Sequence, residues 1–329
     1  MKNITFGIIV TTRGFFNPKL AQEGRRDLLN KLSEMGYDYV VLSEEDTKFG
    51  LVETLEDAKK CAKLFRDNEE KIDGIIISLP NFGDEVGTVT ALSLAKLDVP
   101  LLVQACDDNY KIMDLSNRRD SFCGKLSVCN NLYQNNMKYT DTTHHTCDIN
   151  SEIFTQDLLR FDKICRVVRG LKGARIAQIG TRPAPFKTVR YSEKLLENSG
   201  ITVVPVDLSE IIATAKAMET DELVRAKIDE IKDYGNISEC IEEENIIKSA
   251  KMALTVENWM RENECVAGAM QCWNSIQENY GCAACLPMSM LGEKGIPMAC
   301  ETDITGAITM YPEFPMNYIK AGSSISMSV

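Results

Sequence analysis

Short apolar runs alternate with helical patterns along the first hundred residues, and this alternation restricts the possible folds more than any other feature of the chain. The runs at 4–10, 74–79 and 99–103 are almost wholly apolar, as strands buried on both faces of a parallel sheet are. Helical periodicity fills the intervening segments, at 21–35, 55–66 and 86–97. Strands that alternate with helices predict an α/β layer with a doubly wound parallel sheet.

The same alternation returns in the second half of the chain. Apolar runs at 175–180, 201–206 and 266–271 are separated by helical patterns at 191–198 and 209–263. A polar segment at 120–140 and a long helical pattern at 151–168 divide the two series. Because 329 residues exceed what one core usually serves, we predict two α/β domains, at 1–168 and 169–310. The tail at 311–329 has two early prolines and no clear period.

Charge and composition exclude several classes of partner. The formal net charge of -11 argues against binding to nucleic acid or to an anionic membrane, since both need clustered Lys and Arg. No run reaches the roughly 18 apolar residues that span a bilayer, and the first residues lack the features of a signal peptide. The twelve cysteines lie mostly in apolar runs, which is typical of reduced thiols. We expect a cytoplasmic protein.

The segment 295–307 holds the most informative acids. Glu301 and Asp303 follow an apolar run at i and i+2, so on a strand their side chains would point the same way. Two adjacent carboxylates are costly to keep ionised unless a positive charge lies between them. A divalent cation or a shared proton used in chemistry explains such a pair. The alternative is a pair of solvated loop acids.

A third acid lies close to another strand end. Glu278 stands 25 positions before Asp303 (303 minus 278), just after the Gln271–Cys272–Trp273 segment. Three acids at neighbouring strand ends predict an oxygen-rich site for Mn²⁺ or Mg²⁺. The alternative for Glu278 is an exposed helix residue.

The other motifs favour structural roles over chemical ones. The Cys282-x-x-Cys285 pair lacks a second pair to complete a zinc site, so packing is favoured over metal or redox chemistry. His144 and His145, the two histidines of the chain, lie in a polar segment and favour a loop over a metal role. With no third histidine, a Ser-His-Asp or Cys-His triad is disfavoured. In the first domain, ligands are expected beyond the strand ends, near 11–17, 79–83 and 105–110.

Four separated segments resemble the L-fucose isomerase/L-arabinose isomerase-like sugar isomerases. They are RRDSFCGK at 118–125 with NNL at 130–132, RPAPF at 182–186 with VRYSEK at 189–194, QCW at 271–273, and GIP at 295–297 with ACETD at 299–303 and GA at 306–307. The match runs in order from the N-terminus to about Met310.

The resemblance implies two doubly wound, Rossmann- or flavodoxin-like domains followed by a β-rich C-terminal domain. It also implies aldose–ketose isomerisation with Mn²⁺, or with Mg²⁺ or Co²⁺, held by two acids of the second domain and a histidine of the third. Carried over by position, Glu301 or Asp303 matches one acid and Glu278 is the candidate for the other. Gln271 and Trp273 are the candidates for binding a sugar substrate, and a homotrimer or homohexamer is implied.

The family continues beyond 306–310 into its C-terminal domain, whereas this chain has 19 residues after Met310 (329 minus 310). We therefore expect the β-rich domain and its histidine ligand to be absent. The predicted function is a metal-dependent aldose–ketose isomerase of carbohydrate metabolism, weakly active, working through a cis-enediol. Glu278, Glu301 and Asp303 would share the roles of ligand and proton carrier. The alternatives are a non-catalytic sugar-binding protein and an inactive fragment.

Overall fold

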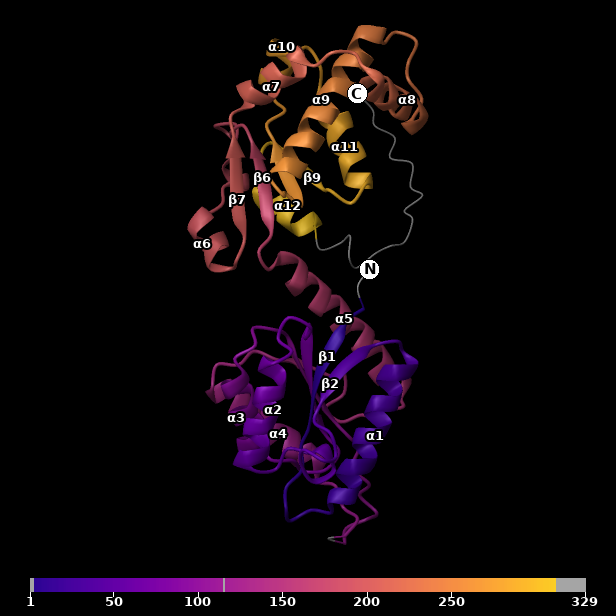
Figure 1. Cartoon of the computed structure of the whole chain (residues 1–329), viewed down its shortest axis with the longest axis vertical. Coiled ribbons are helices and arrows are strands. Elements are labelled where there is room, and N and C mark those ends of the chain that lie inside the picture. Colours follow the sequence, from indigo (N-terminus) through magenta and orange to yellow (C-terminus); the bar gives the residue numbers. More distant parts are fainter. Residues whose placement is uncertain (1–2, 115, 312–329) are drawn as a thin grey trace. The chain divides into compact units, whose positions relative to one another are not determined.

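A computed structural model of the chain describes residues 3–114 and 116–311. It divides the chain into two compact units, Met1–Arg169 and Gly170–Val329 (Figure 1). The predicted tail at 311–329 lies outside the described residues, except for Tyr311. Among the described helices, none combines the length and the apolar composition that a bilayer-spanning helix requires.

Unit 1 is built on a five-stranded, all-parallel sheet with the order β2-β1-β3-β4-β5. Its strands are β1 (Thr5–Val10), β2 (Asp38–Val41), β3 (Gly74–Leu79), β4 (Leu101–Ala105) and β5 (Thr140–Asp141). Its helices are α1 (Pro18–Glu34), α2 (Leu55–Arg66), α3 (Glu85–Ala95), α4 (Ser121–Gln134) and α5 (Glu152–Leu171), with a 3-10 turn at Lys48–Gly50.

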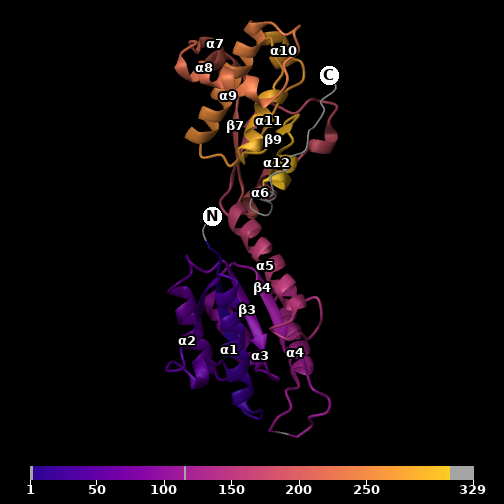
Figure 2. The same cartoon turned by 90° about the vertical axis from the view of Figure 1, so that its right-hand side faces the viewer.

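Two cores cover the two faces of this sheet. Ile9 and Ile77 point into a core shared with α2, α3 and α4, whereas Ile8 and Ile76 point into a core shared with α1 and α5. Successive strand residues face opposite sides, so a continuously apolar strand serves both cores. Figures 1 and 2 show the helices on either side of the sheet.

Unit 2 repeats this plan with four parallel strands in the order β7-β6-β8-β9. The strands are β6 (Arg175–Ile179), β7 (Thr202–Val206), β8 (Ala267–Met270) and β9 (Met298–Cys300). The helices are α6 (Glu193–Asn198), α7 (Leu208–Ala217), α8 (Glu222–Tyr234), α9 (Glu243–Glu262), α10 (Ser275–Asn279), α11 (Cys285–Glu293) and α12 (Ile304–Met310), with a 3-10 turn at Lys187–Val189.

Helices again cover both faces of the sheet. One core joins the sheet to α7, α9 and α11, and the other joins it to α6 and α12. Two doubly wound parallel sheets are therefore present, and the predicted α/β fold class is confirmed. The sheet of unit 2 has one strand fewer than that of unit 1. Its strands are all parallel, so their carboxyl ends lie along one edge.

One predicted break in the alternation is wrong. The polar segment 120–140 contains the helix α4, whose buried positions recur at helical spacing but include Ser121, Gly124 and Lys125. Small and charged residues on a buried face hide the apolar periodicity that predicts helices. The Lys125 ammonium is buried. Its charge is compensated there, because it donates to the Thr142 hydroxyl at 2.7 Å and pairs with Asp141.

Gly124 shows why this face of α4 needs a small residue. A Cβ atom at this position would lie 1.9 Å from the carbonyl oxygen of Phe82, in the loop after β3. Protein interiors do not yield at such a distance without a backbone shift. The glycine therefore lets α4 approach the loop at the carboxyl end of the first sheet.

We predict that Gly124→Ala destabilises the protein by about 3 kcal/mol, because the added methyl group overpacks against backbone. Gly292→Ala in α11 is the matched control, since a Cβ there meets no atom within 4 Å and the change gains up to about 1 kcal/mol of helix propensity. Urea denaturation followed by circular dichroism measures both. Equal stability of Gly124→Ala and wild type would contradict the close approach.

Candidate functional site

The carboxyl edge of the second sheet has the geometry of a ligand-binding edge. The chain adds β7 on one side of β6 and β8 on the other, so the strand order reverses between β6 and β8. Ligands of open α/β sheets bind at such reversal points, outside the carboxyl ends of the strands. A cavity of about 990 Å³ lies here, with Gly180, Thr181, Asp207, Gln271 and Ser275 among its lining residues.

Gln271, a predicted substrate-binding residue, lines this cavity in a fixed orientation. Its Oε1 accepts a hydrogen bond from the backbone N–H of Thr181 at 2.9 Å, which joins the ends of β6 and β8. A second amide, Gln178, also lines the cavity. Its Oε1 accepts from the hydroxyl of Tyr191 and its Nε2 donates to the Gly180 carbonyl. Pre-oriented amides of this kind suit the recognition of hydroxyl groups.

Trp273, the other predicted substrate-binding residue, presents an exposed ring at the same edge. Its side chain is 54% exposed and its ring centroid lies 5.1 Å from that of Phe186. Phe186 belongs to a loop shaped by Arg182, whose guanidinium donates to the carbonyls of Pro183, Ala184 and Phe186. The aromatic pair adds an apolar surface to this edge.

The acidic segment differs from the strand that the sequence predicts. Strand β9 ends at Cys300, and Glu301 and Thr302 have φ angles of 57° and 59°, in the left-handed region. The alternation of strand faces therefore does not apply to Glu301 and Asp303. Left-handed backbone is unfavourable for residues other than glycine, and such strain concentrates at functional sites.

Glu301 is the acid with the most unusual surroundings. Its Oε1 accepts a hydrogen bond from the thiol of Cys272 at 3.1 Å. Burial raises the pKa of this thiol, and the bond to Glu301 raises it further, so the thiol stays protonated and donates. The other oxygen, Oε2, is buried and has no hydrogen-bond partner among the described residues. A buried carboxylate oxygen is costly to leave unpaired, so this atom is the best candidate to meet a ligand.

Asp303 has a structural task in the described geometry. It is the N-cap of α12, where its Oδ1 accepts from the backbone N–H of Gly306 and the hydroxyl of Thr305, each at 2.9 Å. Such a cap satisfies helix N–H groups that otherwise lack a partner. A ligand or proton-transfer role for Asp303 stays a prediction.

Glu278 lies in the first turn of α10 and is exposed. This agrees with the alternative interpretation of Glu278 as an exposed helix residue. Within residues 3–114 and 116–311, no three His, Cys, Asp or Glu side chains are arranged to hold a metal ion. The described structure therefore does not gather Glu278, Glu301 and Asp303 into one metal shell.

The remaining sequence motifs lie elsewhere. His145 bonds the carbonyl of Phe122 through Nε2 at 3.0 Å in unit 1. Cys285 of the Cys-x-x-Cys pair is exposed and Cys282 is half-buried, so buried packing does not describe Cys285. The sequence does not single out Cys272 as a site residue, because a cysteine next to an apolar strand is expected to be a packed core residue.

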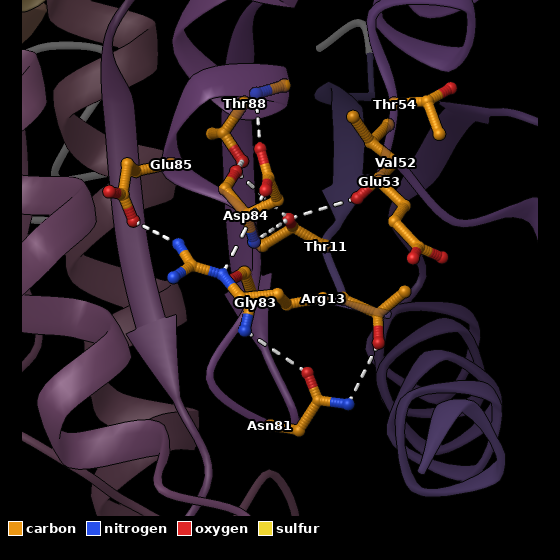
Figure 3. A network of polar contacts seen from close by, with 12 residues as sticks. Thr11, Arg13, Val52, Glu53, Thr54, Asn81, Gly83, Asp84, Glu85 and Thr88 are labelled. Carbon is orange, nitrogen blue, oxygen red and sulfur yellow. Dashed lines mark hydrogen bonds and ion pairs between the residues drawn. The ribbon is translucent and has the colours of Figure 1, made fainter. Parts of the chain in front are cut away.

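Unit 1 holds a polar network at the ends of β1 and β3, where its strand order also reverses (Figure 3). The Thr11 hydroxyl donates to the Val52 carbonyl and accepts from the Asp84 N–H. Arg13 pairs with Asp84 and Glu85, so its charge is balanced within the network. The network holds the loops at 11–17 and 79–83 in place. The sequence predicts that ligands bind near these loops, and that binding stays a prediction.

Glu53 lies beside this network. A Cβ at Gly14 would stand 2.4 Å from the Glu53 Oε1, which shows how closely the carboxylate approaches the loop after β1. Burial raises the pKa of the Glu53 carboxyl above its usual value. The folded chain therefore holds this proton more tightly than the unfolded chain does.

Residues 7–172, which are 166 of the 329 residues, match the family described as fucose/sulfoquinovose isomerase, N-terminal domain. A sulfoquinovose isomerase of Priestia aryabhattai is 24% identical over 251 residues, which cover 74% of this chain and 55% of the relative. One from Alkalicoccus urumqiensis is 24% identical over 235 residues, covering 67% and 51%. The chain thus spans about half the length of the curated relatives it matches.

We predict that Glu53→Gln stabilises the protein at pH 7 but not near pH 4. A raised carboxyl pKa in the folded state means that stability is lost as pH rises from the unfolded pKa through the folded one, and glutamine does not ionise. Thermal unfolding of Glu53→Gln across this pH range measures the difference, with exposed Glu45→Gln as control. A pH-independent difference would exclude the proton linkage.

We predict that Asp303→Ala costs about 1 kcal/mol by removing the N-cap, whereas Asp303→Asn costs much less because asparagine caps equally well. Chemical denaturation measures both variants. If Asp303→Asn destabilises as strongly as Asp303→Ala, the carboxylate charge and not the cap supplies the stability.

Proposed function

Because this chain belongs to the fucose/sulfoquinovose isomerase family, we propose that it takes part in the metal-dependent interconversion of an aldose and a ketose. The observation that supports the proposal most is Glu301. This acid lies at the carboxyl edge of a parallel sheet, with one oxygen held by a thiol and the other buried without a partner in the described residues.

Such an isomerisation moves a proton between C1 and C2 of the sugar through a cis-enediol. A carboxylate close to both carbons carries the proton, and burial favours this by keeping water away from the transfer. A bound divalent cation would stabilise the negative charge that develops on the carbonyl oxygen. Glu301 has the chemistry for the proton transfer or for holding the cation.

The donor set fits a divalent cation in part. Oε2 of Glu301 is a buried carboxylate oxygen that lacks a partner among the described residues, and Mn²⁺, Mg²⁺ and Co²⁺ all accept carboxylate oxygen. Asp303 and Glu278 complete no shell in the described geometry. In our proposal Glu301 is one ligand of the cation. The curated relatives are nearly twice as long as the matched region.

The sugar would bind at the cavity beside Gln271. Amides that are already fixed by the backbone can pair with hydroxyl groups at low entropic cost, and the Trp273–Phe186 pair offers an apolar surface next to them. The names of the relatives make sulfoquinovose the first sugar to test. The homotrimer or homohexamer implied by the resemblance stays a prediction.

A sugar-binding protein without catalysis is the second candidate. The amides and the aromatic pair are in place, whereas the described residues gather no metal shell. Binding of sugar without exchange of its C2 proton would favour this function.

We predict that the full chain, supplied with Mn²⁺ and sulfoquinovose or a simple aldose in D₂O, introduces deuterium at C2, as measured by proton NMR. Glu301→Gln should slow this exchange by at least about 100-fold, because it removes the proton carrier or a ligand. The control is Glu293→Gln, an exposed acid on α11. Exchange that persists undiminished in Glu301→Gln would refute the role of this carboxylate.

A further inference from the structure

Three cysteines lie together at the carboxyl edge of the second sheet, and the proposed proton transfer uses none of them. Cys300 is the last residue of β9 and pairs with Met270 of β8, which Cys272 follows two residues later. Cys285 is the first residue of α11, and Ala284 beside it belongs to the same core as Cys272. Strand pairing and helix packing thus gather thiols that are up to 28 residues apart in the sequence (300 minus 272).

The thiol of Cys300 is in contact with both of the other thiols. Its side chain is hydrogen-bonded to that of Cys272 and to that of Cys285. Cys272 is 5% exposed and its thiol also donates to Glu301, so it forms the buried end of the cluster. Cys285 and Cys300 are both exposed, so a dissolved reagent can reach them. Two accessible thiols in contact are the arrangement from which a disulfide forms.

The Cys-x-x-Cys spacing in the sequence suggests a different partner for Cys285, namely Cys282. In the structure the Cys282 side chain is hydrogen-bonded to Ser249 of α9 and lies near the Lys248 ammonium of the same helix. Cys282 is also less accessible than Cys285, since it is half-buried. The described contacts therefore favour Cys300 over Cys282 as the partner of Cys285.

We propose that Cys285 and Cys300 form a reversible disulfide by exchange with a small-molecule disulfide. With Cys285 as the first to react, its thiolate attacks one sulfur of the small disulfide, whose S–S bond breaks and releases one small thiolate. The Cys300 thiolate then attacks the Cys285 sulfur, which forms the protein disulfide and releases the second small thiolate. The protons of the two protein thiols end on the two small thiols, and the two electrons that the protein loses reduce the small disulfide.

The disulfide joins the start of α11 to the end of β9 and closes a loop of 15 residues (300 minus 285). Closing a loop restricts the unfolded chain more than the folded one, so we expect the oxidised protein to be the more stable form. The exchange involves neither a sugar nor a metal ion. The inference therefore goes beyond the proposed function, and its test needs no isomerase activity.

The test uses the full chain, glutathione disulfide as the oxidant, and mass spectrometry after digestion with a glutamate-specific protease. Cleavage after glutamate separates the possible partners. Fragment 265–278 holds Cys265 and Cys272, fragment 279–293 holds Cys282 and Cys285, and fragment 294–301 holds Cys300.

We expect oxidised wild type to yield fragments 279–293 and 294–301 as one disulfide-linked pair, which dithiothreitol separates. Cys300→Ser should lose this link and retain glutathione as a mixed disulfide on Cys285, because the thiol that displaces it is missing. Oxidation should also shift the thermal unfolding midpoint of wild type upwards, and this upward shift should be absent in Cys300→Ser.

Two variants separate this bond from its alternatives. Cys282→Ser should keep the linked pair, and so should Cys240→Ser, the matched control that removes another exposed cysteine of unit 2. Loss of the link in Cys282→Ser would overturn the proposal, because Cys282 would then be the partner. A wild type that stays reduced, that links to fragment 265–278 instead, or that keeps glutathione on Cys285 without a link would overturn it as well.

Discussion

The parallel pairing of β6, β8 and β9 is the constraint on which the candidate site depends. Parallel strands run in the same direction, so their carboxyl ends meet at one edge of the sheet. Thr181, Gln271 and Glu301, far apart in the sequence, thereby come to lie at a common edge. The hydrogen bonds from Thr181 to Gln271 and from Cys272 to Glu301 follow from this arrangement. Without the pairing, these residues would be isolated polar groups on separate loops.

Polar groups lie at the strand ends of both units, and unit 1 also has a left-handed residue, Asp120, next to a buried hydroxyl without a partner in the described residues, that of Ser121. In unit 1, Arg13 is balanced by Asp84 and Glu85, and the Thr11 hydroxyl both donates and accepts. In unit 2, the end of β9 combines two left-handed residues with buried oxygens of Glu301 and Thr302 that have no partner in the described part of the chain. Strained backbone and unpaired buried polar atoms reduce the free energy of unfolding. Such features cluster at sites that bind ligands. The unpaired Oε2 of Glu301 is the reason why we propose that the reaction takes place in unit 2.

The two acids of the ACETD segment have different surroundings although one residue separates them. Asp303 faces the first turn of α12 and serves its N–H groups, whereas Glu301 faces the thiol of Cys272. The left-handed backbone at 301 and 302 makes this separation, since an extended strand would have pointed both side chains to one side. A pair of acids that looks symmetrical in the sequence is thus divided into a helix cap and a candidate ligand.

The sequence by itself determined the α/β class, the doubly wound sheets and the family, because apolar periodicity reports which residues are buried and separated motifs report descent. It missed α4, whose buried face carries Ser121 and Lys125. It also named Glu301, Gln271 and Trp273 but could not say what they touch. Only the tertiary structure decided that Cys272 contacts Glu301 and that Glu278 stands exposed. The physical reason is that local pattern encodes burial, whereas contacts between distant residues depend on strand register and on turn backbone that non-glycine residues rarely adopt.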